Sequence, residues 1–204
     1  MKAKRVAVLI CVFSMLFTAT VFADSLWGSY EGYSKAKVRI NGSDVAFPEG
    51  DVPAFVMNGR TVLPLRQLTD SLQAMVKWDN DAKTADIYKP NVHMFFAQDV
   101  SNKDYSLQKP FAKVDQGKTV NFVVFSQVDN LKLHVDGFKI SITAPSGEEA
   151  TPALEVPLDT NEESFWYPWP FKVNFTQKGN YTVKFSFLLN NEYTVVSQKV
   201  IVSE

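Results

Sequence analysis

Beyond residue 90 the chain alternates apolar and polar positions with a period of two. The clearest runs are 119–125, 138–143, 181–187 and 193–202. Because successive side chains of a strand point to opposite faces, this alternation predicts strands that each bury one face. Turn-forming residues such as Gln116-Gly117, Lys178-Gly179-Asn180 and Asn190-Asn191 separate the runs at intervals that suit an antiparallel sandwich. We therefore expect an all-β sandwich over residues 93–204.

Residues 35–89 follow a different pattern, in which short apolar runs flank turn signals. Asn41-Gly42 and Asn58-Gly59 each lie between two apolar runs, and each predicts a β-hairpin, because both central residues of a type I′ turn need a positive φ. Pro64 then suits the first turn of a helix. Leucines follow at i, i+3 and i+7, at Leu65, Leu68 and Leu72. This spacing predicts one short helix from about residue 64 to 73.

Two further alternating runs, 74–78 and 84–88, predict a third hairpin that covers this helix. The core of the module is expected to consist of Leu65, Leu68, Leu72, Val76, Trp78 and Ile87. Lys89-Pro90-Asn91 marks the predicted domain boundary. The expected fold class is thus an α+β small module, made of β-hairpins plus one short helix, over 35–89, followed by an all-β immunoglobulin-like sandwich. The immunoglobulin-like label rests on the number of strands and on Lys178 to Val183, which resembles the strand entry of such modules.

The first 23 residues are typical of a secretory signal peptide. Three cations lie within Met1–Arg5, an apolar run follows from Val6 to Phe17, and Val21-Phe22-Ala23 provides a cleavage site after Ala23. The alternative is an uncleaved anchor helix, which would need about 20 apolar residues to span a bilayer. We expect a protein that is secreted into the extracellular space or the cell envelope.

Composition and charge narrow the function classes. The only cysteine, Cys11, lies in the predicted signal peptide, so the mature chain has no disulfide and depends on packed cores. The full chain has a formal net charge of −1, and removal of three signal-peptide cations leaves −4. No basic run follows, which argues against nucleic acid as a partner because phosphate binding requires clustered Lys and Arg. No later segment is apolar enough to span a membrane.

The segment 38–87 resembles the copper amine oxidase N-terminal-like domain, a stalk-type module. The matching residues are Ile40-Asn41-Gly42, Val52-Pro53, Asn58-Gly59-Arg60-Thr61, Pro64-Leu65-Arg66, Leu72, Val76-Lys77-Trp78-Asp79 and Thr84. Of these, Asn58, Gly59, Arg60, Pro64, Arg66 and Trp78 form a structural signature. Gln73 stands where the family usually has a glycine after the helix. The resemblance implies a spacer or interaction module.

The resemblance does not bring the oxidase chemistry with it. Copper amine oxidases bind copper through three histidines and form a quinone cofactor from a tyrosine within Asn-Tyr-Asp/Glu. This chain has only His93 and His134, and its Asn180-Tyr181 pair is followed by Thr182. His134 and Asp136 could share one face of a strand, but a zinc site needs three or four ligands. We therefore expect no cofactor and no metal.

Catalytic patterns are also missing from the sequence. There is no Gly-x-Ser-x-Gly motif, and the mature chain has no nucleophilic cysteine. Two adjacent carboxylate pairs, Glu148-Glu149 and Glu162-Glu163, lie in polar loops and are typical of solvated faces. The pair Arg66 and Asp70, four residues apart on the helix, is expected to form a surface ion pair. We expect no enzyme; an unrecognised hydrolase using these glutamates is a remaining alternative.

The most unusual segment is Phe165-Trp166-Tyr167-Pro168-Trp169-Pro170-Phe171. Its two prolines exclude a regular central strand, so the rings must lie on an edge strand or a loop. Trp166, Tyr167 and Trp169 form a candidate surface for a cell-wall glycan or another secreted protein. The alternative is that these rings close one end of the sandwich or pack on the first module across the Lys89-Pro90 junction. A further alternative is a secreted protease inhibitor or regulator that inserts the loop 159–171 into its partner.

Overall fold

The structure, a computed structural model, describes residues 27–158 and 162–204. The chain divides into two compact units between Pro64 and Leu65. The predicted signal peptide, residues 1–23, lies outside the described residues. The boundaries 35–89 and 93–204 stay a prediction; in the structure the helix and the third hairpin belong to the larger unit. Within the described residues the protein is mostly β with one short helix.

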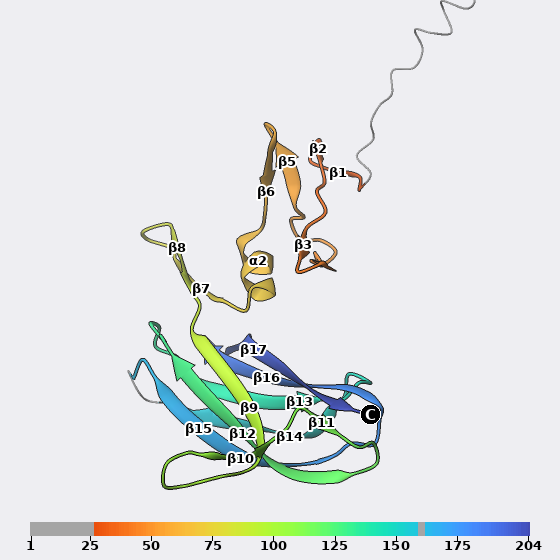
Figure 1. Cartoon of the computed structure of the whole chain (residues 1–204). Helices are drawn as coiled ribbons and strands as arrows, with labels where there is room; N and C mark the ends of the chain where they lie inside the picture. Colours follow the sequence, from red (N-terminus) through yellow and green to blue (C-terminus); the bar gives the residue numbers. More distant parts are fainter. Residues whose placement is uncertain (1–26, 159–161) are drawn as a thin grey trace, which may run out of the picture. The chain divides into compact units, whose positions relative to one another are not determined.

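The smaller unit consists of paired short strands (Figure 1). These are β1 (Ser29–Tyr30), β2 (Tyr33–Ser34), β3 (Arg39–Ile40), β4 (Ser43–Asp44), β5 (Phe55–Met57) and β6 (Arg60–Val62). The predicted hairpins are confirmed as β3-β4 and β5-β6. In the second turn, Asn58 and Gly59 have φ angles of 51° and 71°, which is the geometry of a type I′ turn.

The larger unit begins with helix α2 (Leu65–Ser71), followed by hairpin β7 (Met75–Asp79) and β8 (Thr84–Tyr88). Both elements were predicted. The helix ends at Ser71, and Gln73, two residues later, has a left-handed φ of 57°. The N–H of Ala74 donates to the carbonyl of Thr69 at 2.9 Å. This six-to-one bond is typical of a Schellman cap, so Gln73 takes the place that glycine usually occupies.

The predicted core of this helix and hairpin is wrong. None of its six members is buried, and Leu72, Trp78 and Ile87 are exposed, Trp78 to 57%. The buried residues are instead Thr69, Ala74 and Met75, and Met75 packs into the sandwich core. The β7-β8 hairpin therefore contacts the sandwich at its open end, where Met75 pairs with Tyr88. The other end of the hairpin, near its turn, projects away from the sandwich core.

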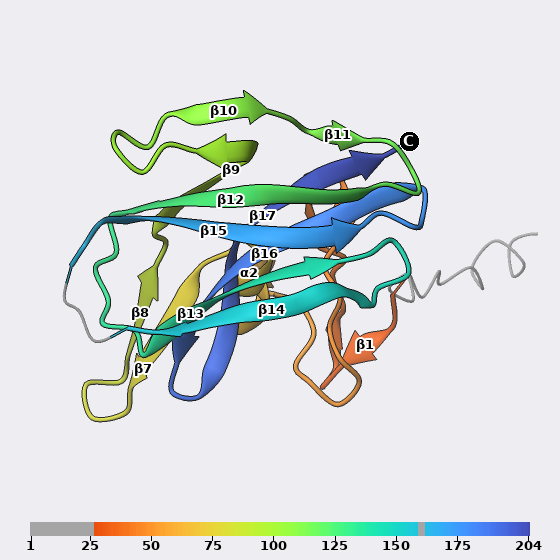
Figure 2. The ribbon, with the colours of Figure 1, turned by 90° about the horizontal axis from the view of Figure 1, so that it is seen from below.

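Residues 91–204 form two stacked sheets (Figure 2). The first sheet has the order β10-β9-β12-β15, with strands β9 (Asn91–Val100), β10 (Leu107–Pro110), β12 (Thr119–Asp129) and β15 (Phe165–Asn174). The second has the order β11-β17-β16-β13-β14, with strands β11 (Lys113–Val114), β13 (Gly137–Thr143), β14 (Glu149–Pro157), β16 (Gly179–Leu189) and β17 (Glu192–Ser203). Except for β11 with β17, the paired strands are antiparallel.

This topology is that of an immunoglobulin-like sandwich. Strands β9, β12 and β15 occupy the places of A, B and E, and β14-β13-β16-β17 those of C′, C, F and G. A tyrosine corner supports the assignment, because the hydroxyl of Tyr181, near the start of β16, accepts a hydrogen bond from the N–H of Gln177 at 3.0 Å. The sandwich expected from the strand pattern is thus observed.

One hydrophobic core fills the space between the sheets. It is rich in aromatic rings; its largest fully buried side chains include Phe122, Phe138, Phe175, Tyr181, Phe185 and Phe187. Phe138 is fully buried and stacks on Phe185 with ring centroids 5.0 Å apart. Such a core can hold the fold together without a disulfide.

Candidate binding surface

The aromatic segment 165–171 lies in β15, at the edge of the first sheet. The expectation of an edge position is therefore confirmed. Pro168 and Pro170 pair with Phe125 and Val123 of β12. Since the two prolines are two residues apart, both lack their N–H on the same side of the strand, and prolines are tolerated in edge strands.

The structure does not bring Trp166, Tyr167 and Trp169 together on one face. Tyr167 points inward and packs edge-on against the core ring of Phe138, with centroids 4.9 Å apart. Trp169 stacks on Tyr167 at 6.1 Å and remains 38% exposed at the side of the sandwich. Trp166 lies on the outer face. Tyr167 and Trp169 thus help to close the sandwich, which is the structural alternative, whereas Trp166 faces outward.

Trp166 joins two rings that are distant in sequence. Its centroid lies 5.6 Å from that of Tyr105 and 5.6 Å from that of Phe125, and the last two rings are 5.9 Å apart. The three ring planes meet at angles between 61° and 72°. Phe125 is only 5% exposed, although its strand register places it on the outer face. Phe125 is therefore the buried base on which the other two rings are held.

The strand register defines the rest of this face. Phe95 of β9 lies opposite Phe125, and it is 48% exposed. In the neighbouring row, Gln127 of β12 lies between His93 of β9 and Trp166 of β15. We call His93, Phe95, Tyr105, Phe125, Gln127 and Trp166 the outer aromatic face.

Tyr105 comes from the loop between β9 and β10, which holds it in an uncommon conformation. Its φ is 56°, a left-handed value that bulky residues rarely adopt. The N–H of Tyr105 donates to the carbonyl of Ser101 at 2.9 Å, and the N–H of Ser106 donates to Asp104 Oδ1 at 3.1 Å. The hydroxyl of Ser101 and the N–H of Ser106 lower the pKa of Asp104. These bonds fix the backbone that presents the ring.

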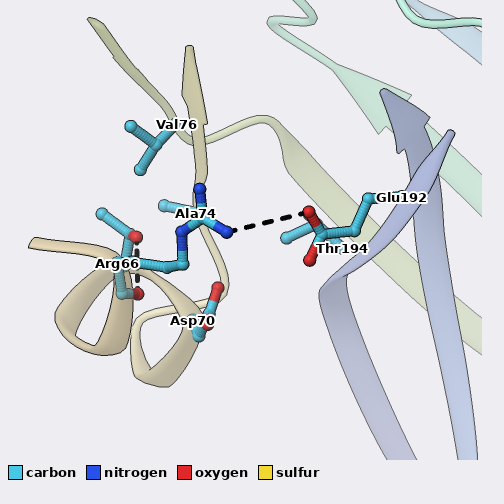
Figure 3. Close-up of a pocket in the computed structure, with 7 residues that line it drawn as sticks. Arg66, Asp70, Ala74, Val76, Glu192 and Thr194 are labelled. Atoms are coloured by element: carbon cyan, nitrogen blue, oxygen red, sulfur yellow. Dashed lines mark hydrogen bonds and ion pairs between the residues drawn. The ribbon is translucent and has the colours of Figure 1, made fainter. Parts of the chain in front are cut away.

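A small hollow lies between α2, β7 and β17 (Figure 3). Arg66 Nη1 is 3.9 Å from Glu192 Oε2, and Asp70 lines the same hollow. The ion pair of Arg66 is thus formed with Glu192, whereas the sequence predicted Asp70. The volume of about 50 Å³ suits a few water molecules. The hollow is too small for a substrate, and we interpret it as part of the attachment of the helix to the sandwich.

The remaining signature residues lie in turns, at an element boundary or on a strand. Asn58, Gly59 and Arg60 form the β5-β6 turn and its exit, Pro64 precedes α2, and Trp78 lies on β7. Neither histidine gathers a ligand set: within residues 27–158 and 162–204, no three His, Cys, Asp or Glu side chains cluster as a metal site requires. His134 lies in the connection between β12 and β13, where Asp136 accepts a hydrogen bond from the N–H of Asn190 at 3.2 Å.

The two carboxylate pairs lie at opposite ends of one strand. Glu148 and Glu149 are at the start of β14, and Glu162 and Glu163 follow its end. Glu163 is paired with Lys132. A glycosidase needs its two carboxyl groups across one cleft, so these pairs do not form such a centre. Of the loop 159–171, residues 159–161 lie outside the described residues.

Sequence reasoning missed Phe95, Tyr105 and Phe125 as members of the surface. A signal for Phe95 exists, because Phe95 and Phe96 are adjacent in a strand and one of them must face outward. No comparable signal exists for Tyr105, since its contact with Trp166 depends on how the β9-β10 loop folds over the sheet.

Comparisons with known proteins include a family match that begins in the smaller unit and ends in strand β12 of the sandwich. Residues 39–120 match the family model of the copper amine oxidase N-terminal domain. No curated protein matches the chain. Among solved structures, an immunoglobulin-like protein from Pseudomonas aeruginosa is similar over 65% of this chain and 98% of its own, with 13% identity and a TM-score of 0.30. The resemblance of the signature residues is therefore confirmed: the segment 39–120 is similar to the copper amine oxidase N-terminal domain.

Proposed function

We propose that this chain is a secreted, non-enzymatic stalk and binding protein of the bacterial cell envelope or extracellular space, which contacts a wall component or another protein. The domain matched by residues 39–120 is non-catalytic in copper amine oxidases. That match favours a role as a stalk or spacer for the matched part of the chain. The secretion signal read from residues 1–23 supports the location.

The observation that carries the binding role is the outer aromatic face. Outward positions of a sheet that faces solvent are usually polar. Here three large rings on one face, Phe95, Tyr105 and Trp166, are exposed by 42% to 49%. Exposed aromatic clusters on a soluble protein commonly mark interaction sites.

No helix among the residues that the structure describes is long and apolar enough to cross a membrane. The Trp-rich strand β15 provides both the test residue and its control, since Trp166 and Trp169 lie on different faces.

The test is a pull-down of the purified mature chain on insoluble cell-wall material that retains its attached proteins. We expect the chain to sediment with the wall and the variant Trp166→Ala to remain in the supernatant. Trp169→Ala removes an equally large ring outside the outer aromatic face and should sediment as the parent does. Equal sedimentation of the parent and Trp166→Ala, or no sedimentation of the parent, would contradict the proposal.

A further inference from the structure

The outer aromatic face combines rings with hydrogen-bonding groups in adjacent rows. His93, Gln127 and Trp166 form one row, and Phe95, Phe125 and Pro168 form the next. Gln127 Nε2 donates to Asp129 Oδ2 at 2.8 Å, which fixes the amide at the end of the sheet. A polar group therefore lies beside each of the exposed rings of these two strands, β9 and β15.

This combination fits a sugar ring. The axial C–H groups of a pyranose give it an apolar face that packs against an aromatic ring, while its hydroxyls need donors and acceptors at the rim. The amide of Gln127 and the imidazole of His93 can supply both.

The charge of the face indicates which sugars it fits. Its outward positions on β9, β12 and β15 include Asp99, Asp129 and Lys172, with no cluster of cations. An anionic polymer would need several Lys or Arg side chains to replace its counterions. The near balance of charges favours an uncharged ligand.

The angles between the rings indicate whether the ligand is a single polysaccharide chain or the surface of a crystalline polysaccharide. The exposed rings of Tyr105 and Trp166 meet at an angle of 71°, so these two stacking rings do not form one plane. A flat crystalline polysaccharide would need coplanar rings, whereas a single chain can rotate about its linkages and meet each ring in turn. The left-handed backbone at Tyr105 is the kind of local strain that is retained where a side chain must be held in place.

We propose that the outer aromatic face binds a single chain of an uncharged polysaccharide, with Trp166, Tyr105 and Phe95 as stacking rings and Gln127 and His93 as hydrogen-bonding groups. This inference rests on the proposed function and names its ligand class. Phe125 supports the rings from below and does not contact the ligand.

The test is native affinity electrophoresis of the mature chain in gels that contain soluble mixed-linkage β-glucan, glycol chitin or dextran. We expect at least one of these neutral polymers to retard the parent. Trp166→Ala and Tyr105→Ala should each raise the apparent Kd roughly tenfold or more, and Trp169→Ala should not. Tyr105 lies in a loop outside the main core, so its variant keeps the test valid if Trp166→Ala fails to fold.

The other outcomes overturn the inference in distinguishable ways. Retardation only by an anionic polymer such as carboxymethyl cellulose would assign a charged ligand, and binding only to microcrystalline cellulose would assign a crystalline one. If no polymer retards the parent while wall sedimentation still depends on Trp166, the glycan assignment is wrong and the proposed function stands, with a wall-attached protein as the partner. If sedimentation also fails, both are wrong.

Discussion

At the scale of single residues, the end of helix α2 depends on an unfavourable backbone conformation. Gln73 has a φ of 57°, which costs a residue with a Cβ more than it costs glycine. We predict that Gln73→Gly raises the free energy of unfolding by roughly 0.5–1 kcal/mol, measured by urea denaturation. Gln73→Ala retains a Cβ and should give no such gain. A glycine variant no more stable than the parent would show that the left-handed cap is not strained.

Asp70 makes the stability of the fold depend on pH in a predictable direction. Partial burial raises the pKa of Asp70, the Arg66 guanidinium offsets part of this rise, and the Glu192 carboxylate adds to it. A raised pKa means that the folded chain binds the proton of the Asp70 carboxyl more tightly than the unfolded chain does. Protonated Asp70 therefore stabilises the fold at acid pH, and this stabilisation is lost as the pH rises through the pKa of the folded state. We predict that Asp70→Asn is more stable than the parent near neutral pH. Since Asp70 is exposed, solvent screening limits the gain to roughly 0.2–0.5 kcal/mol.

The matched control for that experiment is Asp79, whose pKa is shifted in the opposite direction. The N–H groups of Ala82 and Asp81 donate to its carboxylate at 2.9 Å and lower its pKa. Asp79→Asn should therefore lose stability near neutral pH, and the difference from the parent should shrink as the pH falls through the carboxyl range. Urea denaturation of both variants at two pH values tests the pair; equal signs for the two would contradict the assignment.

At the scale of elements, the tyrosine corner connects the β15-β16 turn to the start of β16. Tyr181→Phe keeps the ring contact with Phe175, whose centroid is 4.7 Å away, and removes the acceptor for the N–H of Gln177. We predict a loss of about 1–2 kcal/mol in the free energy of unfolding. Tyr181→Leu loses the ring contact as well and should cost more. An unchanged midpoint for Tyr181→Phe would mean that water replaces the hydroxyl at no cost.

The strands of the sandwich could be predicted because alternation reports burial directly. The same rule could have separated Trp166 from Tyr167, since neighbours in a strand face opposite sides. The prolines prevented that prediction. They excluded a central strand, but they are compatible with both an edge strand and a loop, and only a strand places neighbouring residues on opposite faces. The approach of Tyr105 to Trp166 could not be predicted, as it depends on a loop conformation that no periodicity encodes.

The predicted core of α2 and β7-β8 failed for a related reason. Apolar periodicity shows which residues share a face, but not what covers that face. Val76 pairs with Ile87, and Trp78 with Ala85, so the predicted face exists. Trp78 and Ile87 are nevertheless exposed, because the residues that reach the sandwich core come from the base of the hairpin.

At the scale of the whole molecule, burial is distributed very unevenly between the two units. Among the described residues of the smaller unit, 27–64, the only buried hydrophobic side chain is Ala54. Its strands form two-stranded pairs, and a single bridge between Lys35 and Phe55 links the segment after β2 to β5. A two-stranded hairpin is at best marginally stable in water. The larger unit contains the entire aromatic core. Folding stability should therefore reside in residues 65–204.

We predict that a fragment 65–204 unfolds cooperatively in urea, with a midpoint close to that of the mature chain, because it retains the core. A peptide of residues 27–64 should show no cooperative transition, since it buries too little apolar surface to offset its conformational entropy. Circular dichroism of both pieces beside the mature chain measures this. A cooperative transition in the peptide would show that its hairpins fold independently, and a fragment much less stable than the mature chain would show that residues 27–64 contribute to the stability of the sandwich.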